Sequence, residues 1–334
     1  MPSSIFNVND IGNKDKRTAI LRAQRLEKNK AKSATSAKRK RMEEELGDAA
    51  PPRAIPRTIE NTRTLDETTV AADDVEVLAD EASDEFAAIF SGALAPKVMV
   101  TTARFPSAKV FPLIGALLNV IPQAFYYRRR HFALKKISSW AAERGFTHLI
   151  VVAERGKVAS TLLVSRLRAS GGGGESSGAA GSDDSARVES SALGSSAGPT
   201  AAFRFSSPQL PNEIEGHGTR SDHLPEIILN NFTTRLGRRF GRLVGSLWPH
   251  TPAFRGRQVI TLHNQRDFIF FRHHRYIFDD KGANATLQEL GPRFTLKPLW
   301  LLAGGFDPKE GDYEWRKPSK ANDEAASTRR SFLL

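Results

Sequence analysis

The sequence of 334 residues contains no cysteine and no long apolar run. Because cysteine is absent, a disulfide-stapled fold, a cysteine nucleophile and a zinc site with cysteine ligands are all excluded. The longest apolar stretches, such as residues 146–153, fall far short of the roughly 20 residues that a membrane-spanning helix needs. Charged residues begin at Asp10 and no apolar segment follows them, so we expect no secretory signal and an intracellular protein.

The sequence also lacks patterns that accompany catalysis. The phosphate-binding motif G-x-x-x-x-G-K-[ST] does not occur. His263, His273 and His274 have neither the i,i+4 spacing of a helical zinc site nor a cysteine partner. The basic segment at 97–168 contains only two acidic residues, too few for paired-acid or two-metal catalysis. We therefore expect a protein that is not an enzyme and that holds no metal or cofactor; an RNA-modifying enzyme is the weaker alternative.

Positive charge is what the sequence has in excess, with 49 Lys and Arg against 37 Asp and Glu and a net charge of +12. The charge is divided into blocks of opposite sign. Residues 1–42 hold 12 basic and 3 acidic side chains, whereas residues 43–91 hold 3 and 14. Residues 97–168 hold 13 and 2, and residues 235–300 hold 12 and 4. The basic excess favours a polyanionic partner, but it does not choose between RNA, DNA and an anionic membrane.

The first 96 residues contain few large apolar side chains and no sustained alternation of apolar and polar residues. Such a segment buries too little surface to offset the entropy lost on ordering. We therefore predict a mostly disordered, charged extension with a transient basic helix inside residues 14–45. A compact basic cluster there has the composition of a nuclear localisation signal, although a solvated charge run has the same composition. The cluster consists of Lys38, Arg39, Lys40 and Arg41.

A second low-complexity segment, residues 170–198, consists mainly of Gly, Ser and Ala. It separates a strand-like segment at 158–167 from one in which Phe203 and Phe205 alternate with Arg204. A flexible insertion at the tip of a hairpin costs little loop entropy, so we predict such an insertion rather than a domain boundary.

The rest of the sequence divides into two halves with one plan. Each half contains a Thr-Thr pair, an amphipathic helix, a proline that ends the helix and an Ala-Phe pair. The predicted elements are a strand at 97–102, helices at about 112–121, 131–144 and 235–248, and strands at 146–153, 258–264 and 267–271. We therefore predict an α/β (α+β) domain over residues 97–304, built as a duplicated unit. Its halves are residues 97–210 and 225–304, and a C-terminal tail follows at 305–334.

The predicted helix at 235–248 carries an apolar stripe and a separate stripe of arginines. No carboxylate lies among the arginines, and their spacing makes them repel one another, so we favour a phosphate-facing stripe over a solvated face. Glycines at every fourth position indicate that a neighbouring helix or strand approaches closely. The arginines are Arg235, Arg238, Arg239 and Arg242, and the glycines are Gly237, Gly241 and Gly245.

A segment that mixes aromatic and basic residues begins at Phe268. Aromatic faces stack on unpaired bases and arginine contacts phosphate, so this composition suits RNA. Phe268 and Phe270 share one face of the predicted strand, and Ile269 and Phe271 share the other. Both faces are therefore apolar, and we predict a central strand whose aromatic side chains lie mainly in the core. The cations at 272–275 are then the better RNA-contact candidates.

Several segments together resemble the Brix-domain family. They are IILNNFTTRLG at 227–237, RGRQV at 255–259, HNQRDFIFFRHHRY at 263–276, LQELGPRFTLK at 287–297, GDYEW at 311–315 and TRR at 328–330. The resemblance covers roughly residues 97–334 apart from the Gly/Ser-rich insertion.

This resemblance implies a nuclear, nucleolar factor that binds precursor rRNA and helps to assemble the large (60S) ribosomal subunit. Its partners would be other pre-60S assembly factors, among them a smaller zinc-bearing protein. The implied fold has two halves that resemble the anticodon-binding domain of class II aminoacyl-tRNA synthetases. The family's sigma-70-like segment, credited with RNA binding, maps onto residues 282–299. Pro298 departs from the pattern there, because it follows Lys297 where a continued strand is expected.

The basic stretches and the sigma-70-like segment together give one set of candidate RNA-binding residues. The set consists of Arg128, Arg129, Arg130, Lys135, Lys136, Arg235, Arg238, Arg239, Arg242, Arg255, Arg257, Arg272, His274, Arg275, Gln288, Gly291, Pro292, Arg293, Phe294, Thr295 and Lys297.

Two other interpretations stay open at this stage. The protein could be a docking scaffold of pre-ribosomes whose RNA contact is incidental, or a small-subunit processing factor with the same fold. Neither a membrane nor a small-molecule substrate is expected as a partner.

Overall fold

The computed structural model describes residues 13–47, 56–58, 68–71, 74–168, 197–279, 284–306 and 311–317. The chain divides into two compact units, residues 1–64 and 65–334. The predicted insertion at 170–198 lies outside the described residues except for its last two positions. Most of the predicted tail at 305–334 also lies outside them.

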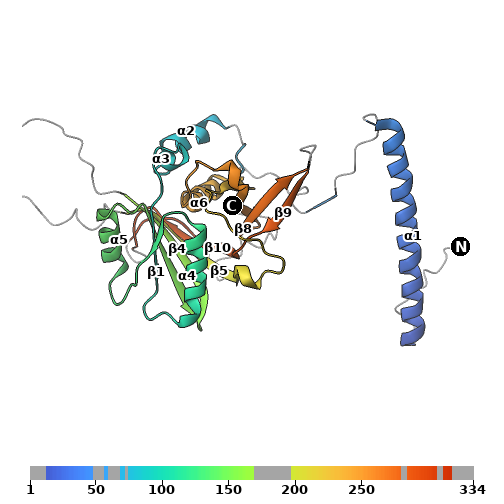
Figure 1. Cartoon of the computed structure of the whole chain (residues 1–334), viewed down its shortest axis with the longest axis horizontal. Helices are drawn as coiled ribbons and strands as arrows, with labels where there is room; N and C mark the ends of the chain where they lie inside the picture. The colour runs from blue at the N-terminus through green and yellow to red at the C-terminus, as the bar shows by residue number, and fades with distance from the viewer. Residues whose placement is uncertain are drawn as a thin grey trace, which may run out of the picture. The chain divides into compact units, whose positions relative to one another are not determined.

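In the first unit, residues 14–46 form the long helix α1 (Lys14–Leu46; Figure 1). The helix begins after Asn13, whose side-chain oxygen accepts hydrogen bonds from the backbone N–H groups of Asp15 and Lys16 at 3.0 and 3.2 Å. None of its residues is buried. Among the described helices, none is long and apolar enough to cross a membrane.

The second unit is built on a mixed sheet whose main strand order is β2-β1-β3-β4-β5-β10-β8-β7-β6 (Figure 1). The strands of the first half are β1 (Val98–Thr102), β2 (Ala124–Tyr126), β3 (His148–Arg155), β4 (Val158–Leu167) and β5 (Ala197–Gln209). Those of the second half are β6 (Glu226–Asn230), β7 (Gln258–Gln265), β8 (Phe268–Phe278), β9 (Ala285–Glu289), β10 (Arg293–Leu302) and β11 (Tyr313–Arg316). Strand β9 pairs with β8, and β11 pairs with β10.

The pairing pattern occurs twice in the sheet. Strand β1 is parallel to β3, and β4 and β5 then follow in antiparallel steps. In the same way β6 is parallel to β7, and β8 and β10 follow in antiparallel steps. The two series meet where β5 pairs antiparallel with β10 at the centre of the sheet. The predicted mixed α/β fold is therefore confirmed, and most predicted elements differ at their ends by three residues or fewer.

Helices cover the two faces of the sheet unequally. The helices of this unit are α2 (Val75–Ser83), α3 (Ala87–Phe90), α4 (Phe111–Val120), α5 (Leu134–Glu143) and α6 (Arg235–Gly245). The main core packs α4 and α6 against one face and includes Leu117, Phe240 and Phe271. A smaller core, with Ile137 and Leu149, lies beneath α5 on the other face. The opposite face is thus covered by α5 only over the first half.

The ordered part of the second unit starts earlier than the sequence predicts. Residues 75–90, assigned above to a mostly disordered extension, form α2 and α3, which lie over α6 in Figure 1. Phe86 and Ile89 are completely buried, and Thr69 forms an isolated antiparallel bridge with Thr234. The physical reason is that a short apolar cluster, inside a strongly acidic block, has a large core to pack against. That segment is too short for its apolar pattern to show a period.

The glycines of α6 allow the close approach that their spacing predicts. A Cβ atom on Gly241 would lie 3.2 Å from the ring of Phe232. One on Gly245 would lie 3.3 Å from Leu229 and 3.4 Å from Phe90. The neighbours are thus side chains from β6, from the turn after it and from α3, packed against the helix backbone.

Truncating Phe86 tests whether residues 75–90 belong to the folded unit. Because this ring is fully buried, we expect Phe86→Ala to lower the free energy of unfolding by about 3–5 kcal/mol. Val75 on α2 is 79% exposed, and Val75→Ala should change stability by less than about 0.5 kcal/mol. Urea denaturation of the full chain measures both. If both substitutions changed the free energy of unfolding equally little, residues 75–90 would belong to the disordered extension.

Candidate nucleic-acid interface

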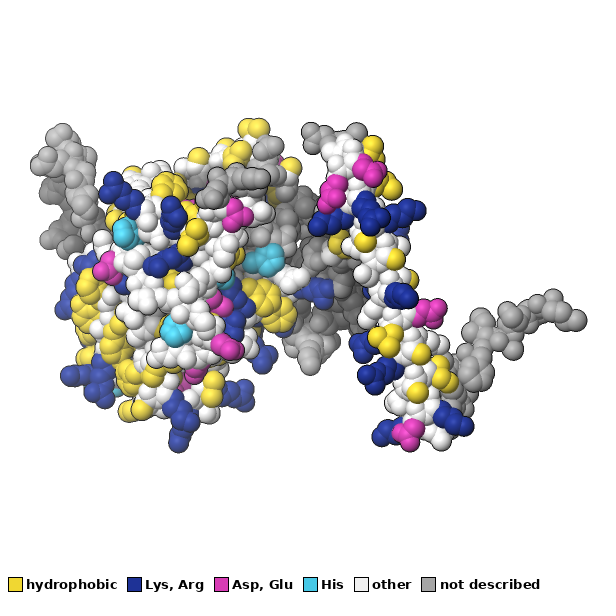
Figure 2. All heavy atoms as spheres, turned by 45° about the vertical axis from the view of Figure 1, so that its right-hand side comes forward, with side chains coloured by type: hydrophobic (Ala, Val, Ile, Leu, Met, Phe, Trp, Pro, Cys, Tyr) yellow, Lys and Arg dark blue, Asp and Glu magenta, His cyan; other side chains and the backbone are white. Residues whose placement is uncertain are grey.

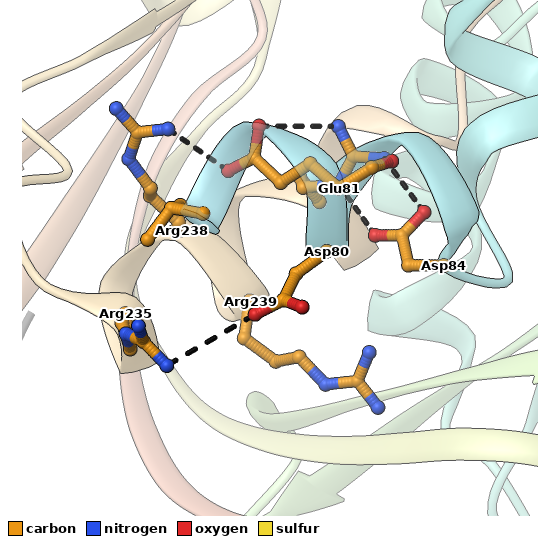
Figure 3. Close-up of a pocket in the computed structure, with 8 residues that line it drawn as sticks. Asp80, Glu81, Asp84, Arg235, Arg238 and Arg239 are labelled. Carbon is orange, nitrogen blue, oxygen red and sulfur yellow. Dashed lines mark hydrogen bonds and ion pairs between the residues drawn. The ribbon is translucent and has the colours of Figure 1, made fainter. Parts of the chain in front are cut away.

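Helix α6 has one face on the sheet and one face on α2. It is capped by Thr234, whose hydroxyl oxygen accepts a hydrogen bond from the Gly237 N–H at 3.0 Å. Phe240 and Leu243 are fully buried in the main core. The four arginines therefore lie on the remaining faces. Figure 3 shows Arg235 and Arg238 beside the acidic side chains of α2, whereas Arg239 points away from them.

Each of these arginines is paired with at least one carboxylate. The closest N–O distances are Arg235–Glu76 2.9 Å, Arg238–Glu81 3.0 Å, Arg239–Glu85 2.9 Å, Arg239–Glu314 2.8 Å and Arg242–Asp84 2.6 Å. We call this set of residues the ion-pair cluster. It joins the acidic segment at 76–85 to α6, and Glu314 attaches β11 to the same helix.

The ion-pair cluster is buried at one end and exposed at the other. The side chains of Arg242 and Asp84 are only 10% and 14% exposed, whereas those of Arg235 and Glu76 are 55% and 73% exposed. The Arg242 guanidinium also donates to the carbonyl oxygen of Glu81 at 2.7 Å and lies 4.3 Å from the ring centroid of Phe90. The buried end therefore fixes α2 most strongly, because water and salt screen the exposed pair.

Arg239 and Glu85 change each other's pKa. Burial raises the pKa of Glu85. Hydrogen bonds and the charge of Arg239 lower it by more, so the pKa of Glu85 lies below its ordinary value. Burial lowers the pKa of Arg239, but hydrogen bonds to Glu314 and Glu85 raise it above the ordinary value. Both groups are therefore charged at neutral pH, and the pair contributes to stability at that pH.

The favoured interpretation of these arginines as a phosphate-facing stripe differs from the structure. Their carboxylate partners come from the same chain, and Arg238 lies 157 residues from Glu81. No carboxylate is near them in the local sequence, which is why the stripe looked unpaired. In the structure these four side chains pair with carboxylates of residues 76–85 and with Glu314 on β11.

A different basic surface lies on the face of the sheet opposite α6. Alternate side chains of neighbouring strands share a face, and the strand pairing places Lys297 opposite Arg204 and Thr295 opposite Phe270. We call this surface the open sheet face. It consists of Arg204 on β5, Phe268, Phe270, Arg272 and His274 on β8, and Arg293, Thr295 and Lys297 on β10. All of these side chains are exposed or half-buried.

Cations and aromatic rings alternate across the open sheet face. The Lys297 ammonium lies 4.1 Å from the ring centroid of Phe268, and the Arg272 guanidinium lies 5.8 Å from that of Phe270. Arg293 forms an ion pair with Glu289 at 3.2 Å. Rings with one accessible face beside cations are the combination that binds unpaired bases and their phosphates.

The electrostatics of the open sheet face favour an anionic ligand. Burial lowers the pKa of Lys297, as do the positive charges of Lys317 and Arg204, whereas Asp267 raises it. Burial also lowers the pKa of Arg272, with Arg293 acting in the same direction. Cations close enough to depress one another's pKa gain from a bound polyanion, because its phosphates neutralise their repulsion.

The remaining RNA-binding candidates are either buried or on the surface outside the open sheet face. Gly291, Pro292 and Phe294 are buried, and Phe294 stacks on Phe271 with a centroid separation of 4.4 Å. These three therefore shape the turn and the core and do not face solvent, contrary to their place in the predicted RNA-binding set. The surface candidates outside the open sheet face are Arg128, Arg129, Arg130, Lys135, Lys136, Arg255, Arg257, Arg275 and Gln288. The predicted localisation cluster at 38–41 lies on α1.

Sequence analysis missed three residues of the open sheet face. Arg204 was identified as alternating with Phe203 and Phe205, but only the structure places it beside Lys297. Phe268 and Phe270 were expected mainly in the core. Strand β8 does lie inside the sheet, but Phe268 is 36% exposed because no described helix covers this part of that face. Among the described residues, no three His, Asp or Glu side chains gather as a metal site.

Comparison with known proteins places this fold in a family. The model of the Brix domain matches residues 103–300. Ribosome production factor 1 from Pongo abelii is 44% identical over 330 residues, which cover 98% of this chain and 85% of that protein. The probable ribosome production factor 1 from Drosophila melanogaster is 37% identical and covers 96% of this chain and 74% of its own length. A probable ribosomal biogenesis protein from Aeropyrum pernix K1, known as a crystal structure, is 16% identical with a TM-score of 0.40; the match covers 60% of this chain and 96% of that one.

Two single substitutions test the burial gradient of the ion-pair cluster. We expect Arg242→Ala to lower the free energy of unfolding by about 3–5 kcal/mol, because it leaves the Asp84 carboxylate buried without its partner. Arg235→Ala removes an exposed pair and should cost far less. Denaturant titration of the two variants compares them directly. Wild-type stability in Arg242→Ala would show that these arginines do not hold α2.

Proposed function

This chain belongs to the Brix-domain family, and from that premise we propose that it is a non-catalytic, rRNA-binding assembly factor of the large ribosomal subunit. It is homologous to ribosome production factor 1. The nucleolus is the compartment in which such a factor would act. Its proposed partners are precursor rRNA and other pre-60S factors, including the zinc-bearing protein that the family resemblance implies. The duplicated order of strands agrees with two halves resembling class II anticodon-binding domains.

The open sheet face is the observation that carries RNA binding. It brings four cations and two partly exposed phenylalanine rings onto one surface, from strands β5, β8 and β10. Phosphate contacts from the cations supply affinity, and the rings give unpaired bases a place to stack. A flat sheet surface does not enter the deep, narrow major groove of an RNA duplex, so we infer that this face binds single-stranded segments.

A docking scaffold is the second candidate function, and one observation favours it. Ile277, Phe278 and Leu287, at the far end of the β8–β9 pair, are each more than half exposed. Neighbouring exposed apolar side chains mark surfaces that bind other proteins. Phe278 and Leu287 lie on the same side of the β8–β9 pair as His274, beyond the cations of the open sheet face, so one chain can carry both activities.

Removing two cations from the open sheet face tests the RNA-binding proposal. We expect Arg204→Gln with Lys297→Gln to weaken binding of an unstructured RNA and to reduce the slope of log K against log salt by about 1.4, since each lost contact with a single strand removes about 0.7. Fluorescence anisotropy across a salt series measures both quantities. The matched control is Lys109→Gln with Arg155→Gln, which removes the same charge elsewhere and should leave the slope nearly unchanged. Equal slopes in the two variants would leave docking as the better function.

Sedimentation tests which ribosomal subunit the chain helps to assemble. A tagged full-length chain should travel with particles that contain the large-subunit rRNA precursor, identified by hybridisation of the RNA in each gradient fraction. Loss of the chain from these particles in the Arg204→Gln, Lys297→Gln variant would connect the site with the assembly. Co-sedimentation with the small-subunit precursor instead would transfer the function to that subunit.

A further inference from the structure

Helix α1 is the longest helix among the described residues. None of its side chains is buried, and it carries 12 basic and 5 acidic residues. Figure 2 shows Lys and Arg side chains along its length, with apolar side chains scattered among them. Its exposed charged residues are therefore the feature of α1 to be explained.

Half of the basic residues of α1 lie along one side of the helix. With 3.6 residues per turn, six of the twelve fall within about 80° of one another when viewed down the helix axis. They are Lys14, Arg17, Arg25, Lys28, Lys32 and Arg39, and we call them the α1 basic stripe. Along this stripe the first acidic residue is Glu43 at its end, which pairs with Arg39 at 3.0 Å. The stripe is about 38 Å long at 1.5 Å per residue.

The other side chains of α1 exclude three common uses of such a helix. Its larger apolar residues, including Ile20, Leu21 and Leu26, point in different directions and form no stripe for a coiled coil or for a membrane surface. No aromatic residue occurs between positions 14 and 46, so the helix offers nothing on which unpaired bases could stack. The stripe provides positive charge in a fixed, straight array and little else.

We propose that α1 is a second nucleic-acid site, which binds the phosphates of double-stranded RNA along the α1 basic stripe. A straight row of cations about as long as one turn of a double helix matches a rigid duplex better than a flexible strand. The wide, shallow minor groove of an RNA duplex has phosphates on both sides, and a helix lying across it contacts them without access to base edges. Arg25, Lys28 and Lys32 repel one another at i,i+3 and i,i+4 spacing, and bound phosphates relieve that repulsion.

This site differs from the open sheet face in ligand and in position along the chain. It rests on the proposed function only in that its ligand is RNA. The sheet face would take unpaired segments through rings and cations, whereas α1 would take a duplex through charge alone. A variant can therefore lose duplex binding at α1 and keep single-strand binding at the open sheet face, or the reverse.

The test uses the full chain with two RNA probes: a blunt duplex of about 20 base pairs, longer than the roughly 16 base pairs a compact double-strand-binding module spans, and an unstructured single strand. One variant replaces Arg17, Arg25, Lys28 and Lys32 on the stripe with glutamine. The control replaces Lys16, Lys30, Lys38 and Arg41, which lie within about 80° of one another on the other side of the helix. Both variants lose four charges, and glutamine keeps the helix propensity of the residues it replaces.

We expect the stripe variant to lose on the order of tenfold in duplex affinity and about 3–4 in the salt slope, with the control much less affected. Amide hydrogen exchange in α1 should slow when the duplex binds and not when the single strand binds. Equal losses in the two variants, unchanged duplex affinity in both, or an absence of α1 protection would each overturn the proposal. Single-strand binding reports on the sheet face: if it fails while duplex binding depends on the stripe, the proposed sheet-face function is wrong and the α1 site stands.

Discussion

The pairing of Arg242 with Asp84 is the contact on which the arrangement of the second unit depends most. It joins an acidic segment to the most basic helix of the domain, at a site where both side chains are nearly excluded from solvent. Helix α6 therefore has the sheet on one side and α2 on the other, and it cannot move without disturbing both. The arginines of α6 are paired with carboxylates of the same chain, and the other basic surface, the open sheet face, lies on the opposite side of the sheet.

Most of the sheet was predictable from the sequence, because its strands and helices follow local periodicity. The predicted start of α4 at about residue 112 also lies within one residue of the observed start at Phe111, and Pro112 lies in the first turn. The helix predicted to end at 248 ends earlier, at Gly245. The carboxylate partners of the α6 arginines could not be predicted from the sequence. A local pattern shows neither a carboxylate 157 residues away nor that part of the acidic block at 43–91 folds. The open sheet face was predicted only in part. Arg272, Arg293 and Lys297 were candidates, but the exposure of Phe268 could not be predicted, because it follows from α5 covering only the first half of this face.

The two units carry their positive charge on different kinds of structure. The first unit presents positive charge on a helix with no core, whereas the second presents it on a sheet whose opposite face is packed. A sheet can position rings beside cations, and a lone helix can only space its cations regularly. The two proposed sites would suit an RNA in which unpaired and paired regions lie close together.

The central pair of strands has a consequence for how the protein is made. Strand β5 ends the first half, but its partner β10 is encoded about ninety residues later, as shown by Ser206 and Thr295, which lie 89 residues apart. During synthesis the first half therefore emerges from the ribosome with an unpaired strand edge, which other chains can join. Neither half can complete its sheet alone. The domain becomes whole only when translation has passed β10, so a truncated product that ends between the halves is expected to aggregate rather than to act as a smaller version of the protein.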